Sequence, residues 1–134
     1  MCTITQWKKP RRTNRDIVCY KTGCRAEDKF VSGIRSFEYT LNELYEAPLE
    51  ESFEPEDICP ADYVETEYYR GFTEETLRYI ASGFHACLTV RGAEQNKGIF
   101  ADTRVRCVVP KGSLYYKDRT GLIVSNRMIV EKFD

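Results

Sequence analysis

The feature that most constrains this fold is the alternation of apolar and polar residues over short stretches bounded by glycine or proline. The strongest example is residues 103–109, where Val105, Cys107 and Val109 occupy every second position. A period of two places such side chains on one face of a β-strand. A turn is expected at residues 110–113, which contain a proline and a glycine. The same pattern predicts strands around residues 114–117, 122–124 and 127–133.

The first two-thirds of the chain contain further strand-like segments. Residues 16–21 are a short segment with β-branched residues that ends before Gly23, and residues 36–41 alternate with period two. Residues 84–88 repeat the alternation. With nine Tyr and seven Phe in the chain, the aromatic content also favours strands over a helical bundle.

One segment, from Thr73 to Gly83, is predicted to be a helix. Thr73 is placed to cap the first amides, and two glutamates follow it at the positive end of the helix dipole. Leu77, Ile80 and Ala81 fall on one helical face. Gly83 suits the left-handed residue that ends many helices.

These elements predict an α+β fold, built on a mainly antiparallel sheet with one or two helices. Residues 93–100, which follow Gly92 and contain Gly98, are ambiguous and fit a second short helix. No internal repeat or linker is visible in the 134 residues, so residues 1–134 are expected to form a single domain.

The cysteines and the N-terminal sequence bear on the cellular compartment. The chain has no apolar run near the length of a membrane span and no apolar segment typical of a secretory signal. A cytoplasmic protein with no membrane partner is therefore expected. Its thiols should be reduced and unmetallated, with no metal site and no cofactor, because no C-x-x-C pair occurs and the chain has a single His. There are six cysteines: Cys2, Cys19, Cys24, Cys59, Cys87 and Cys107.

Charge is segregated along the chain although the net charge is −1. Residues 1–36 carry a balance of +6, residues 37–76 a balance of −12, and residues 77–134 a balance of +5. Residues 1–15 form a basic arm, interpreted as a solvated or partly disordered terminus. Residues 46–62 form an acidic, proline-rich loop that is a candidate surface for a protein partner. The acidic segment should repel phosphate, which argues against nucleic-acid binding.

Three residues are candidate binding residues on chemical grounds. His85 has a side chain that titrates near neutral pH, and it stands where the predicted helix gives way to a strand. Lys111 belongs to a Pro-Lys-Gly-Ser sequence, for which a turn is a better interpretation than a phosphate loop. Arg106 contributes with Lys111 to the basic character of the C-terminal half.

The second half of the chain resembles a group of small bacterial and phage-type proteins of unknown function. The stretches that carry the resemblance are residues 83–86, 105–116 and 123–130, together with Tyr20 and Lys21 in the first strand. The resemblance implies an origin and does not specify an activity.

A more distant similarity is to the ADP-ribosyltransferase-like fold. In that pattern, Lys21 stands at the position of the basic residue on the first strand, and residues 85–89 lie near the middle motif. Residues 125–127 stand where the family has its catalytic Glu, and Glu131 lies further along. The similarity implies a nucleotide substrate and makes Lys21 a fourth candidate binding residue.

Three functional hypotheses follow. The first is a small cytoplasmic binding or interaction protein of mobile-element type. The second is an enzyme that acts on a nucleotide substrate, with a site near His85. The third is nucleic-acid binding through the basic arm. The first two differ in whether His85 lines a cleft.

Overall fold

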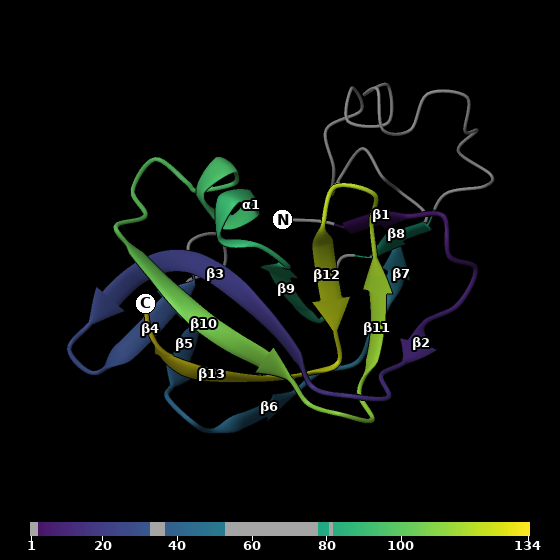
Figure 1. The fold of residues 1–134 in the computed structure, drawn as a ribbon, viewed down its shortest axis with the longest axis horizontal. Helices are drawn as coiled ribbons and strands as arrows, with labels where there is room; N and C mark the ends of the chain where they lie inside the picture. Colours follow the sequence, from purple (N-terminus) through teal and green to yellow (C-terminus); the bar gives the residue numbers. More distant parts are fainter. Residues whose placement is uncertain (1–2, 33–36, 53–77, 81) are drawn as a thin grey trace.

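The computed structural model describes residues 3–32, 37–52, 78–80 and 82–134, and these residues form mostly antiparallel sheet with one short helix. Figure 1 shows the arrangement of the elements. Their bounds are β1 (Thr3–Thr5), β2 (Arg11–Arg12), β3 (Ile17–Ala26), β4 (Lys29–Ser32), β5 (Glu38–Thr40), β6 (Leu44–Glu46), β7 (Glu51–Ser52), β8 (Arg78–Ile80), β9 (Phe84–Cys87), α1 (Val90–Gln95), β10 (Thr103–Val109), β11 (Leu114–Lys117), β12 (Leu122–Ser125) and β13 (Arg127–Phe133).

The strands make two sheets. The larger sheet has the order β2-β11-β12-β9-β3-β10-β13-β6, and a branch adds β4 and then β5 to β3. The smaller sheet has the order β1-β8-β7. All of the strand pairs are antiparallel among the described residues. The expected mainly antiparallel sheet is therefore confirmed, although the fold is more sheet-dominated than the α+β class implies.

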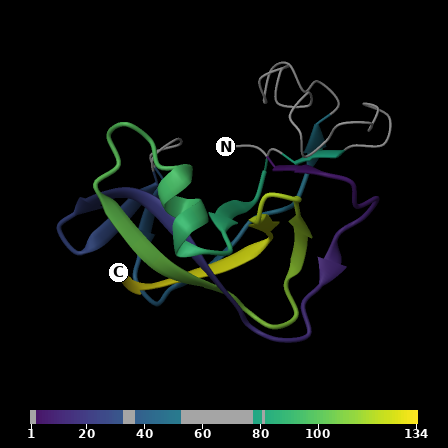
Figure 2. The ribbon, with the colours of Figure 1, turned by 45° about the horizontal axis from the view of Figure 1, so that its top comes forward.

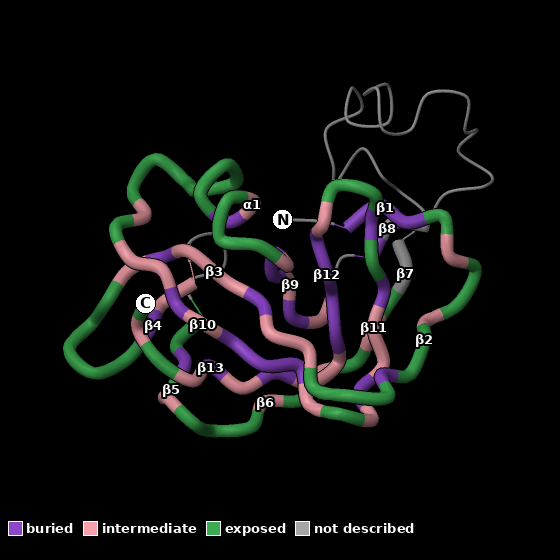
Figure 3. Tube along the Cα trace, viewed as in Figure 1, coloured by how far each residue is buried: buried purple, intermediate pink, exposed green. Residues whose placement is uncertain are grey.

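The alternation in β10 builds the centre of the core. Val105, Cys107 and Val109 have no exposed surface, and β10 pairs with β3 on one side and β13 on the other. Figure 3 shows buried residues along β9, β10 and β12. Burial of these side chains is the main stabilising term for such a sheet.

Strand β3 changes partner along the edge that does not pair with β10. Tyr20 opposite Cys87 is the single bridge between β3 and β9 in the described residues. Pairing with β4 begins at Gly23, which lies opposite Ser32. The backbone of Lys21 and Thr22 thus lies between two partners, and the sheet forks there.

The helix is short and covers part of the sheet. Thr89 caps α1 by accepting a hydrogen bond of 3.0 Å from the Gly92 amide. Ala93 is buried in a cluster with Cys87 and Leu122, against which Tyr20 packs. Figures 1 and 2 show α1 beside β3 and β9, where these contacts hold it.

The prediction of a helix from Thr73 to Gly83 is wrong for the part of this segment that the structure describes. Arg78–Ile80 forms strand β8, which pairs with β1 and β7, and Ile80 is fully buried. Pairing with a distant strand has overridden a local helical pattern. Residues 73–77 lie outside the described residues. The helix that the structure does contain lies partly in the ambiguous stretch, at Val90–Gln95.

The basic arm is built into the fold over the part that is described. Strand β1 is buried, and the guanidinium of Arg12 donates a hydrogen bond of 2.6 Å to the Gly112 carbonyl. The Arg11 guanidinium lies 3.9 Å from the centre of the Trp7 ring. Residues 3–5 and Thr13 are buried, whereas the basic side chains of the arm, Lys8, Lys9, Arg11 and Arg12, are exposed.

The acidic loop is described only in part. Glu46 ends β6, and Glu51–Ser52 forms β7, whereas residues 53–62 lie outside the described residues. Within the described ranges, no helix is long and apolar enough to cross a membrane.

Candidate functional site

A pocket of about 510 Å³ opens at the fork of the sheet. Its walls come from β3, β5, β6 and β9, from α1 and from the loop that follows α1. Lys21 and Thr22 line it at the point where β3 has left β9 and has not yet joined β4. The interruption in strand pairing therefore leaves room for the pocket.

Lys21 is the cationic side chain of this pocket. It is half-buried, and its ammonium donates a hydrogen bond to the main-chain carbonyl of His85 on β9. The ammonium also lies 5.9 Å from the centre of the Tyr39 ring. Burial lowers the pKa of Lys21 below its ordinary value, because the charged form loses hydration. The lysine thus bridges two strands that no longer pair.

Aromatic rings form one wall of the pocket. Tyr39 is almost fully buried, and its ring centre lies 4.8 Å from that of Phe37, 5.1 Å from that of Tyr45 and 6.2 Å from that of Phe84. These pairs are edge-to-face, a favourable arrangement for ring quadrupoles. Burial raises the pKa of Tyr39, so its hydroxyl stays protonated. The accessible apolar surface of this wall comes mainly from Phe37, which is 44% exposed, and from the half-buried Tyr45.

Buried thiols lie near Lys21. Cys19 and Cys107 are directly opposite across β3 and β10, and both are free. A hydrogen bond shared with Cys107, followed by burial, raises the pKa of Cys19 well above its usual value. Burial raises the pKa of Cys87 to about 11. Because the thiolate is the nucleophile, raised pKa values make these two cysteines unreactive near neutral pH.

His85 lies in the pocket wall on β9. Its Nδ1 forms a hydrogen bond of 3.0 Å with the Thr3 hydroxyl, and its side chain is half-buried. The strand holds it in register opposite Val124 of β12. His85 therefore meets Lys21 through its main-chain carbonyl, whereas its imidazole is held by a residue of β1.

The mouth of the pocket is apolar and exposed. Ile99 is 95% exposed and Phe100 is 88% exposed, and both line the pocket. The Cys24 thiol donates a hydrogen bond of 3.3 Å to the Phe100 carbonyl, which ties this loop to β3. Two adjacent large apolar side chains at a pocket mouth are a feature of ligand or partner contact.

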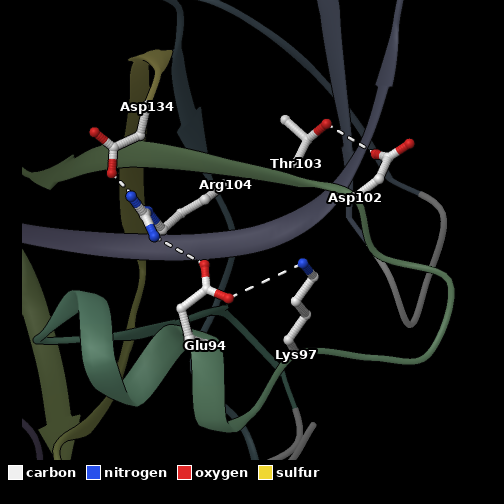
Figure 4. A network of polar contacts seen from close by, with 6 residues as sticks. All are labelled: Glu94, Lys97, Asp102, Thr103, Arg104 and Asp134. Carbon is white, nitrogen blue, oxygen red and sulfur yellow. Dashed lines mark hydrogen bonds and ion pairs between the residues drawn. The ribbon is translucent and has the colours of Figure 1, made fainter.

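An ion-pair network fixes the helix that carries this loop (Figure 4). The Arg104 guanidinium contacts Glu94 of α1 at 2.8 Å and Asp134 at 2.6 Å. Lys97 also approaches Glu94, at 4.0 Å. Single surface ion pairs contribute little to stability. Arg104 of β10, however, contacts both α1 and the C-terminal residue, and so fixes their positions relative to β10. The network thus positions Asn96 and the loop at the pocket mouth.

The structure brings together two of the four predicted binding residues. Lys21 and His85 line the same pocket, whereas Arg106 and Lys111 do not. Arg106 forms an ion pair of 2.7 Å with Glu131. Lys111 is exposed in the expected turn, and its amide donates to Asp16 at 2.8 Å. The aromatic wall and the apolar mouth are absent from the sequence-based candidates, although the apolar pair after Gly98 was a usable signal.

Among the described residues, no group of three His, Cys, Asp or Glu side chains is arranged to hold a metal ion. The chain was also compared with family models, curated proteins and solved structures, and none of them matches it. The pocket is therefore the main guide to function.

Proposed function

We propose that this protein binds a small molecule with an apolar, aromatic body in the pocket at the fork of β3. The observation that carries the proposal is the pocket itself, which has about 510 Å³ of space between an aromatic wall and an exposed apolar mouth. Binding sites for small molecules are commonly 300–1,000 Å³ in volume, mostly apolar, with a few polar groups. Lys21 supplies a polar group of that kind.

The exposed mouth is the strongest sign that something docks there. Exposing Ile99 and Phe100 to water is unfavourable in the free protein, and a ligand that covers them recovers part of that free energy. Isolated exposed apolar residues are common on protein surfaces, but this pair adjoins a pocket of similar character.

His85 lines the pocket, as the second hypothesis requires, but its imidazole is engaged by Thr3, so binding is favoured over the nucleotide enzyme. Lys21 and His85 already contact protein groups, and the nearby thiols are held protonated. Residues 125–127 and Glu131, which the ADP-ribosyltransferase-like pattern would use, do not line the pocket. Their absence from the pocket supports a binding role over transfer chemistry.

Nucleic-acid binding through the arm is disfavoured for a different reason. Arg11 stacks on Trp7, and Arg12 is engaged by the Gly112 carbonyl, so both contribute to intramolecular contacts. A cytoplasmic location, a mobile-element origin and a protein partner for the acidic segment stay predictions from the sequence.

A fluorescence titration with the neutral probe N-phenyl-1-naphthylamine tests the binding proposal. The double variant Ile99→Ser/Phe100→Ser is expected to bind the probe about tenfold more weakly, because it removes apolar surface at the mouth. Its stability should change little, since both side chains are exposed.

The matched control for this titration is Leu44→Ser. Leu44 is 41% exposed but does not line the pocket, so this variant should bind the probe like the wild type. Absence of saturable probe binding by the wild type would refute the proposed function. If Leu44→Ser weakens probe binding as much as Ile99→Ser/Phe100→Ser does, the probe binds outside the pocket.

A further inference from the structure

The charge of Lys21 has no counter-ion among the described residues. The ion pairs formed there by other basic residues involve Lys29, Lys97, Arg104, Arg106 and Arg127. The two contacts of the Lys21 ammonium, the His85 carbonyl and the Tyr39 ring, are both with uncharged groups. A half-buried cation in such a setting favours a bound anion, because an opposite charge offsets the lost hydration.

We propose that the ligand is an aromatic monocarboxylate whose carboxylate pairs with Lys21 and whose ring lies against the aromatic wall, on the side of Phe37 and Tyr45. This inference rests on the proposed function and names the chemical class of the ligand.

A single carboxylate suits the charge of the site. Among the described residues that line the pocket, Lys21 is the one lysine or arginine. One ammonium balances one negative charge, whereas a phosphate dianion is typically held by several cations or by a set of backbone amides. The acidic lining residue, Glu46, is 67% exposed in its side chain and lies 3.5 Å from Arg127, so it does not neutralise Lys21.

The aromatic body follows from the wall beside the lysine. The Tyr39 ring lies both under the Lys21 ammonium and in edge-to-face contact with Phe84. A ligand ring joined to a carboxylate would place its charge at Lys21 while extending this set of ring contacts. Phe100 at the mouth would then cover the outer edge of the ligand.

Calorimetric titration with 2-naphthoate and 2-naphthamide tests the inference. The two probes share a ring system and nearly the same shape but differ in charge. Wild-type protein is expected to bind 2-naphthoate at least about tenfold more tightly than 2-naphthamide. In Lys21→Met the preference should fall to within about twofold, through loss of 2-naphthoate affinity with 2-naphthamide affinity kept.

Two further variants make the test specific. Lys132→Met removes an exposed charge of β13 that does not line the pocket, so the preference should be unchanged. Lys21→Arg keeps the charge and should keep the preference for 2-naphthoate, which leaves the inference testable even if Lys21→Met does not fold.

The result that overturns the inference is equal affinity for the two probes in the wild type, or a preference that survives in Lys21→Met. If N-phenyl-1-naphthylamine binds but 2-naphthoate does not, the carboxylate assignment is wrong and the proposed pocket function stands. If none of the three probes binds, the proposed function fails as well.

Discussion

Replacing Phe30 with alanine is expected to lower the free energy of unfolding by about 3–5 kcal/mol. Phe30 lies on β4 with no exposed surface, and its ring centre is 6.0 Å from that of Tyr39. The substitution removes a large apolar side chain that packs beside Tyr39 and leaves a cavity in the core. Urea unfolding followed by circular dichroism measures the loss.

Phe100→Ala is the control for that measurement. The same chemical change is made at a side chain that is 88% exposed, so the free energy of unfolding should stay within about 0.5 kcal/mol of the wild-type value. A loss below about 1 kcal/mol for Phe30→Ala would contradict the packing of β4 and β5 against the main sheet.

Gly23→Ala is expected to cost about 2–3 kcal/mol by overpacking. A Cβ atom at Gly23 would overlap the Val31 carbonyl oxygen and lie 2.9 Å from Cζ of Phe30. The backbone of β4 would have to move away from β3, since the carbonyl belongs to the strand opposite. Gly23 is therefore the residue that allows β3 to take β4 as its new partner immediately after the fork.

The matched variant is Gly98→Ala, made where a Cβ atom would meet no neighbour within 4 Å. It should leave the free energy of unfolding within about 0.5 kcal/mol of the wild-type value. Similar stability of the two variants would mean that β4 does not approach β3 as closely as the structure has it.

The strands were predictable where local alternation and burial agree. Residues 103–109 show period-two alternation, and the structure confirms both the strand and its buried face. The segment around Ile80 was not predictable from local pattern. A buried helix face and a buried strand would both account for an apolar residue at Ile80. The strand is set by pairing between Tyr79 and Ile4 of β1, which is far from it in the sequence.

The candidate site was predictable only in part. His85 could be proposed from its chemistry, and Lys21 followed from a family resemblance, yet nothing in the sequence placed them together. Their proximity depends on β3 leaving β9 after Tyr20 and joining β4 at Gly23, which is a property of strand pairing. Charge makes Arg106 a candidate, and charge together with a turn motif makes Lys111 one. Neither feature indicates which face of the sheet lines a pocket.

The most direct test of the binding proposal is a ¹H–¹⁵N NMR titration of the whole protein with N-phenyl-1-naphthylamine. Saturable shifts are expected at amides in residues 20–24, 82–87 and 96–101, which surround the pocket. A smaller hollow of about 190 Å³ lies beside Trp7 and Lys117 and serves as the internal comparison. Shifts confined to that hollow, or no saturable shifts at any amide, would contradict the assignment of the pocket as the ligand site.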